Sequence, residues 1–177
     1  APEIMQATNS TVEAGARGAA DATGDGNGGT VVVWADYDTI FIGEISARGA
    51  GAGRGGLVET SGKDTLYFDG SVDTTAESGL TGVLLLDPRN ASINSSAAAA
   101  NNINEVTLET ALGLNNVVIS TFNVGGVEAG WIRLNGGTGV NWNSAYSLSL
   151  IAEGDIFVGR DITNNGTGNI NLIAGWD

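Results

Sequence analysis

Carboxylates are the residue type in this chain best suited to chemistry, because its 177 residues include 20 Asp and Glu but no His and no Cys. Two stretches align without a gap at an offset of 27 residues, which places Asp36 beside Lys63 and Tyr37 beside Asp64 on neighbouring repeats. The same alignment brings two further carboxylates near, Glu59 and Asp38. Carboxylates with a basic neighbour can carry acid–base catalysis on polysaccharides. Charges at the corners of repeats are more often solvated or paired, so we expect no catalytic residues here.

Oxygen ligands also gather in the segment Asp21–Asn27, with the sequence DATGDGN. Closely spaced Asp and Asn side chains are typical of calcium loops. The segment lacks the terminal Glu of an EF-hand and departs from the Gly/Asp nonapeptide of calcium-binding β-rolls. We interpret it as a corner between strands, and we expect neither a metal site nor a cofactor.

Aromatic side chains offer a third kind of chemistry, since their faces pack on the apolar faces of sugars. Tyr67 alternates with Phe68, so we expect it to point outward together with Asp69. These two outward residues are the sequence's candidates for ligand binding. The other aromatic candidates, most of them expected to serve the core or seal corners, are Trp34, Trp131, Trp142, Trp176, Tyr37 and Tyr146.

The composition narrows the function classes. A formal net charge of −13 disfavours nucleic acid and anionic lipid as partners. The absence of Cys and His removes disulfides, thiolate chemistry and the usual zinc sites. No apolar run approaches the length of a membrane-spanning helix, so we expect no membrane insertion. The start at Ala1 has neither an initiator Met nor a signal sequence, and we expect a piece of a longer protein.

Internal repeats indicate which strands hold these residues in place. The 27-residue offset pairs Phe41 with Phe68 and Ile45 with Val72, always on one parity, which predicts stacked strands. In the preceding repeat, residues 12–14 (VEA) resemble residues 45–47 (ISA), which matches Val12 with Ile45. Two further matches have offsets of 26 and 22: residues 56–58 with 82–84, and residues 147–152 with 169–174.

Repeats of this length with Gly, Asn and Asp corners predict an all-β fold, a right-handed parallel β-helix (β-solenoid) of about seven coils. We expect coils over residues 1–91, an insertion over 92–114, and continuing coils of the same domain over 115–177. Leu108, Leu112 and Gly113 predict a short helix of about two turns in the insertion. An antiparallel sandwich is the structural alternative.

The same segments resemble a known family. The ordered set GGTVVVWAD at 28–36, ISARG at 45–49, GGLVETSG at 55–62 and LLLDP at 84–88 resembles the repeat region of filamentous haemagglutinin-type adhesins, the large exoproteins of two-partner secretion. The resemblance is specific over residues 28–90 and looser over residues 103–177. The family's amino-terminal secretion domain is not found in this chain.

This resemblance implies a non-enzymatic segment of a bacterial adhesin, secreted to or held at the outer-membrane surface of a Gram-negative cell, with a role in cell adhesion and virulence. Its implied partners are an outer-membrane transporter during export and an unidentified receptor or glycan on host cells or bacteria. A carbohydrate-active β-helix enzyme and the stalk of a contact-dependent toxin are the alternatives. Glycosylation stays open at four sequons, at Asn9, Asn90, Asn94 and Asn165.

Overall fold

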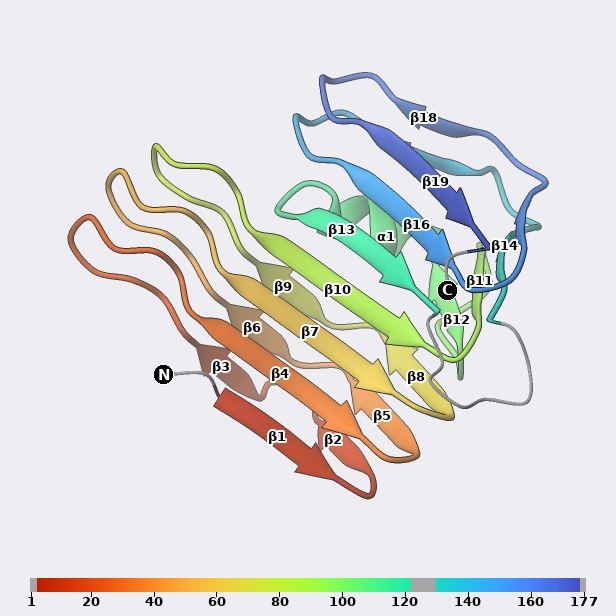
Figure 1. Cartoon of the computed structure of the whole chain (residues 1–177), viewed down its shortest axis with the longest axis horizontal. Helices are drawn as coiled ribbons and strands as arrows, with labels where there is room; N and C mark the ends of the chain where they lie inside the picture. The colour runs from red at the N-terminus through yellow and green to blue at the C-terminus, as the bar shows by residue number, and fades with distance from the viewer. Residues whose placement is uncertain (1–2, 122–129, 176–177) are drawn as a thin grey trace.

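A computed structural model describes residues 3–121 and 130–175, with side chains from residue 8 onward. The described chain is mostly β, and all pairings between its strands are parallel. Figure 1 shows the strands arranged as layers across the molecule, with the amino terminus at one end and the last strands at the other. Within the described ranges, no helix is long and apolar enough to cross a membrane.

A long sheet runs the whole length of the described chain. This sheet contains every third strand of the described chain, from β1 to β19. The seven strands in spatial order are β1 (Glu3–Ala7), β4 (Thr30–Ala35), β7 (Leu57–Gly62), β10 (Val83–Pro88), β13 (Asn116–Ser120), β16 (Leu148–Ala152) and β19 (Ile170–Ala174).

Shorter parallel sheets lie behind the long one (Figure 1). Two three-stranded sheets belong to the amino-terminal half: β2 (Ser10–Val12), β5 (Asp38–Phe41) and β8 (Thr65–Phe68), then β3 (Arg17–Ala19), β6 (Glu44–Ser46) and β9 (Ser71–Asp73). A four-stranded sheet has the order β12 (Asn102–Asn104), β11 (Ala91–Asn94), β14 (Ile132–Leu134) and β17 (Ile156–Val158). A pair is formed by β15 (Val140–Trp142) and β18 (Ile162–Asn164). The chain thus visits the sheets in turn and returns to the long sheet.

The register of these sheets confirms the repeat offsets. Phe41 pairs with Phe68 and Val31 with Val58, both at 27 residues. Leu57 pairs with Val83 at an offset of 26, and β16 pairs with β19 at an offset of 22. The match of Val12 with Ile45 is wrong, because Val12 pairs with Phe41.

Alternation along the strands builds the core. The Phe41 and Phe68 rings stack with centroids 5.5 Å apart and planes 9° apart, and both side chains are at most 1% exposed. Stacked identical side chains fill the same space in successive repeats and bury large apolar areas. The residues predicted to face inward are all buried, namely Val31, Val33, Phe41, Ile45, Val58, Leu66, Phe68 and Val72.

A short helix follows β12, as the sequence predicted. It is α1 (Glu105–Ala111), and its N-cap Asn104 accepts hydrogen bonds from the backbone N–H groups of Val106 and Thr107. Such a cap satisfies donors that have no partner inside the helix. Leu108 and Leu112 are fully buried in the common core. The helix therefore packs against the sheets as part of the same core.

Asn101 joins this segment to the earlier sheets. It has a positive φ of 56°, its Oδ1 accepts from the N–H of Leu66 at 2.9 Å, and its own N–H donates to the Leu66 carbonyl at 2.8 Å. Asn tolerates this left-handed conformation better than most residues. Its contacts satisfy backbone groups of β8 at the point where the three-stranded sheet ends.

Candidate functional site

The charged residues that the sequence placed side by side are neighbours where β4 and β7 end. The Lys63 ammonium lies 3.3 Å from Asp36 Oδ1 and 5.0 Å from the centre of the Trp34 ring. Both charged side chains are about half exposed, 58% and 48%. Exposed pairs of this kind contribute about 0–1 kcal/mol. Asp36 is therefore occupied by a surface ion pair that links two repeats.

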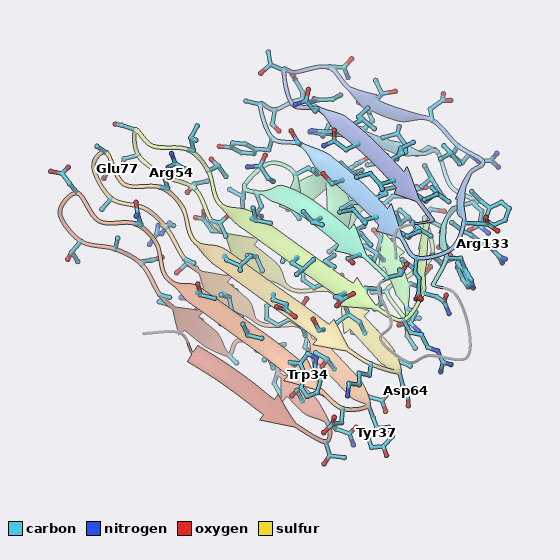
Figure 2. The ribbon with its side chains drawn as sticks, in the orientation of Figure 1. Trp34, Tyr37, Arg54, Asp64, Glu77 and Arg133 are labelled. Carbon is cyan, nitrogen blue, oxygen red and sulfur yellow. The ribbon has the colours of Figure 1, made fainter. Side chains whose placement is uncertain are left out.

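Tyr37 and Asp64 also lie together, at the edge of the molecule labelled in Figure 2. Their contact runs through the backbone, since the Asp64 N–H donates to the Tyr37 carbonyl at 3.0 Å. The Asp64 carboxylate lies 3.6 Å from Arg89 Nη1. Asp38 accepts a hydrogen bond of 2.5 Å from Thr65 Oγ1. Each of these carboxylates thus binds a residue of a neighbouring repeat.

A different pair of carboxylates, Glu59 and Asp87, lies on the outer face of the long sheet. Glu59 is half-buried on β7, and its Oε1 accepts a 2.6 Å hydrogen bond from Ser61 Oγ. Asp87 is half-buried on β10, directly beside Ser61 in the register. Burial raises the pKa of Asp87 to about 7, and the negative charge of Glu59 adds to the rise.

This pair has an arrangement that acid–base chemistry uses, because a carboxyl group with a raised pKa lies near a second carboxyl group. The sequence analysis named Glu59 and missed Asp87. The 26-residue offset that aligns Val58 with Leu84 also aligns Ser61 with Asp87, so the proximity was readable. The burial was not, because it depends on the side chains packed around the sheet.

Tyr67 and Asp69 point away from the core, and the structure gives them different surroundings. Tyr67 is half-buried on β8, while Asp69 is exposed and accepts a 2.9 Å hydrogen bond from Thr107 Oγ1 on α1. Asp69 lies in a groove of about 330 Å³ between the helix and the ends of the short sheets. The groove's lining includes Ile42, Asp69, Ser71, Val106, Thr110 and Leu114, and it does not include Tyr67.

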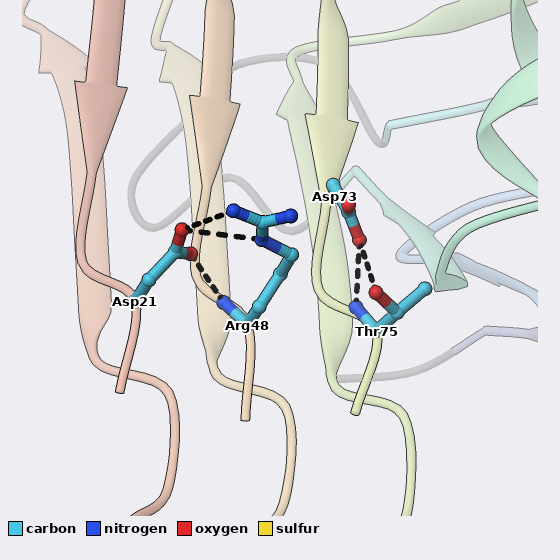
Figure 3. A network of polar contacts seen from close by, with 4 residues as sticks. All are labelled: Asp21, Arg48, Asp73 and Thr75. Carbon is cyan, nitrogen blue, oxygen red and sulfur yellow. Dashed lines mark hydrogen bonds and ion pairs between the residues drawn. The ribbon is translucent and has the colours of Figure 1, made fainter. Parts of the chain in front are cut away.

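A second groove of about 450 Å³ runs over β3, β6 and β9 and shares Glu44, Ser71 and Leu114 with the first. Figure 3 shows part of its polar wall. The Arg48 side chain donates to Asp21 Oδ2 from Nε and Nη2, at 3.1 and 2.8 Å, and the Arg48 N–H donates to Asp21 Oδ1 at 2.7 Å. Burial opposes ionisation of Asp21, but these bonds outweigh it and lower the pKa of Asp21.

The segment Asp21–Asn27 uses its oxygen atoms to bind the next repeat. Asp25 Oδ1 accepts from the N–H of Ala52 at 3.3 Å, and Asn27 Oδ1 accepts from the N–H of Arg54 at 2.8 Å. Within residues 3–121 and 130–175, no group of three or more acidic residues could hold a metal ion. The segment is a corner whose side chains hold two repeats in register.

The aromatic side chains differ in how far they are exposed. Trp142 is 5% exposed, and its indole N–H donates to the Tyr146 carbonyl, so it seals a corner as expected. Tyr37 is 54% exposed. Trp131 is half-buried beside Arg133, and Trp176 lies outside the described residues.

The four sequons also differ in access. Asn9 and Asn165 are exposed and Asn94 is half-buried, whereas Asn90 is only 9% exposed. Asn90 Oδ1 accepts a 2.9 Å hydrogen bond from the Trp131 N–H. Asn90 therefore has a structural role that a glycan would disturb.

No family model, no curated protein and no solved structure matches this chain. The described residues form a mostly β protein with long parallel sheets.

Proposed function

We propose that this chain is a rod-like segment of a secreted bacterial surface adhesin, folded as a right-handed parallel β-helix of about seven coils. Its role is to display a binding surface toward host cells, other bacteria or matrix. The observation that carries the proposal is the return of the chain to one seven-stranded parallel sheet after each visit to the shorter sheets. Stacked repeats of this kind bury a continuous core and present a long outer surface, which suits spacing and binding.

The sequence resemblance over residues 28–90 supports the surface location and export through an outer-membrane transporter. The structural support is the use of polar side chains to join successive repeats. Pairs 27 residues apart include Asp21 with Arg48 and Asp36 with Lys63. Such ladders stiffen an elongated molecule that has no Cys for disulfides.

The experiment is adhesion of beads coated with the chain to epithelial cells and to bacteria. The test variant combines Tyr67→Ser with Asp69→Asn, which changes the outward residues of β8 and the α1 groove. The matched control combines Tyr37→Ser with Glu13→Gln, the same types of change at exposed positions elsewhere. We expect wild-type beads to adhere, the test variant to adhere at least threefold less, and the control to match wild type. Wild-type adhesion no greater than that of beads coated with albumin would refute the proposed function.

A carbohydrate-active enzyme is the second candidate, and the raised pKa of Asp87 beside Glu59 is the observation that favours it. Product release from acidic and neutral polysaccharides tests it. The variants are Asp87→Asn and Glu59→Gln, with Asp36→Asn combined with Asp64→Asn for the surface carboxylates. We expect no turnover by any of these proteins. Cleavage that Asp87→Asn abolishes would replace the adhesive function with a catalytic one.

A further inference from the structure

Arg133 is held between two aromatic rings on the outer face of the four-stranded sheet. Its guanidinium carbon lies 4.2 Å from the centre of the Trp131 ring and 5.1 Å from that of Phe157. Arg133 points outward because its strand neighbours Ile132 and Leu134 are at most 1% exposed. Phe157 is its register partner on β17 and is 49% exposed. Two aromatic rings thus lie against one exposed guanidinium.

The N–H groups of this guanidinium have no acceptor among the described residues, and Arg133 forms no ion pair there. Three other basic residues form ion pairs within the described ranges: Arg17 with Glu44, Arg48 with Asp21 and Lys63 with Asp36. A planar guanidinium that lies against aromatic rings has donors arranged for two-point binding of a carboxylate.

Most outward side chains of the described strands around Arg133 are neutral, and the acidic neighbour in the register is the exposed Asp155, whose carbonyl accepts from the N–H of Ile132 at 3.0 Å. The outward residues of the four strands are Asn102 and Asn104 on β12, Ser92 and Asn94 on β11, Arg133 on β14, and Phe157 on β17. Neutral hydrogen bonds connect them: Asn94 Nδ2 donates to Asn102 Oδ1 at 2.6 Å, and Ser92 Oγ donates to Asn135 Oδ1 at 3.3 Å. Arg133 therefore lies among neutral amide and hydroxyl groups of the described strands.

Aromatic edges and faces, amide and hydroxyl groups, and one oriented Arg are together the groups that recognise an acidic sugar. The sugar ring packs on aromatic carbon, its hydroxyls meet Asn and Ser, and its carboxylate meets the guanidinium. We propose that the platform of Trp131, Arg133 and Phe157 binds a carboxylate-bearing sugar in an oligosaccharide. This inference rests on the proposed adhesive function and names its ligand class. Densely charged polyanions are disfavoured by the net charge of −13.

The test is isothermal titration of the whole chain with two pairs of probes. The first pair is 3′-sialyllactose and lactose, and the second is tetragalacturonate and its methyl ester, so that each pair differs in the carboxylate. The variant is Arg133→Gln, with Arg54→Gln as the matched control. Arg54 is exposed on a loop far from Arg133, and the two are labelled at opposite sides of Figure 2. Circular dichroism and melting curves check that both variants fold.

We expect at least one acidic probe to bind, its neutral partner to bind at least tenfold more weakly, Arg133→Gln to lose at least tenfold, and Arg54→Gln to lose less than twofold. Binding of 3′-sialyllactose would identify a sialic acid as the ligand, and binding of tetragalacturonate would identify a uronic acid. No binding of either acidic probe, equal binding of the neutral partner, or an equal loss in both variants overturns the inference. Tighter binding of tetraglutamate than of the sugars also overturns it, because the site would then recognise a peptide.

Failure of this inference is distinguishable from failure of the adhesive function. Beads that adhere while the chain binds no acidic sugar would leave the adhesive function standing on another surface. Sugar binding lost in Arg133→Gln, by a chain whose beads do not adhere, would support the platform and refute the cell-binding role.

Discussion

The pKa values of Asp21, in the corner after β3, and Asp87, on β10, shift in opposite directions because their surroundings differ. Asp21 receives three hydrogen bonds from Arg48, which outweigh the effect of burial and lower the pKa of Asp21. Asp87 has no such donor among the described residues, so burial and the charge of Glu59 raise the pKa of Asp87 to about 7. The Asp21 contribution to stability is present above its unfolded-state pKa and is lost on acidification. That of Asp87 has the opposite sign.

The first prediction concerns Asp87. Its pKa is about 3.8 in the unfolded chain and about 7 in the folded one, so the folded state holds an extra proton between these values. Stability contributed by this proton is present near pH 4 and is lost as the pH rises through 7. Replacing Asp87 by Asn should leave stability unchanged near pH 4 and raise it by about 1–3 kcal/mol at pH 8. Urea unfolding of both proteins between pH 4 and 8 measures the difference, and parallel pH profiles would contradict it.

At the scale of elements, the second prediction concerns the stacked rings of β5 and β8. Phe68→Ala removes a side chain that is 1% exposed and stacked on Phe41, and should cost about 3–5 kcal/mol. Tyr37→Ala is the control, because Tyr37 is 54% exposed and such changes usually shift stability by about 0.5 kcal/mol. The midpoints of urea unfolding compare the two variants. Equal costs would show that the stacked pair is not part of the cooperative core.

The third prediction concerns the start of α1. Asn104 caps the helix through Oδ1, and its Nδ2 donates to the Ser96 carbonyl at 2.8 Å. Asn104→Ala should therefore cost about 1 kcal/mol. Asn104→Asp keeps the capping oxygen and should recover most of that loss, because a negative charge is favourable at a helix N-terminus. Thermal melting of the three proteins tests this order, and Asp no better than Ala would show that the cap is not the cause.

The elements also show how far the sequence predicts the fold. Alternation at a fixed 27-residue offset was enough to pair Phe41 with Phe68 and Lys63 with Asp36. The predicted pairing of Val12 with Ile45 was wrong, because four residues separate β2 from β3 while two separate β5 from β6. Loop length does not change the inward and outward pattern within a strand. A local insertion therefore shifts pairing without leaving a signal in the strands themselves.

The candidate sites were less predictable than the core. Asp69 was named for its parity alone, and its groove exists because α1 packs beside it, through contacts between distant segments. Arg133 was not singled out, since the sequence does not show that Phe157 becomes its register partner 24 residues later. Asp87 was missed because its burial depends on the side chains packed around the long sheet, although its register was readable. Sites built across repeats of unequal length become visible only when the register is known.

At the scale of the whole molecule, the net charge of −13 raises the question of whether cations hold the repeats together. The repeats are instead joined by hydrogen bonds between protein groups. The oxygen atoms of Asp25 and Asn27 accept backbone N–H groups of the next repeat, and Asp21 is bound by Arg48. A calcium ion would have to displace these donors before it could use the same oxygens.

The last prediction is therefore that calcium changes the stability of the whole molecule very little. A ligand that binds only the folded state raises the free energy of unfolding by about 2.7 kcal/mol when its concentration is one hundred times its dissociation constant. We expect millimolar Ca²⁺ or EDTA to shift the melting temperature by less than about 2 °C, because the loop's oxygens already have partners. Mg²⁺ at the same ionic strength controls for general screening of the acidic surface. A larger rise that is specific to Ca²⁺ and abolished by Asp25→Ala would contradict this account, since it would require the loop to exchange its backbone partners for the ion.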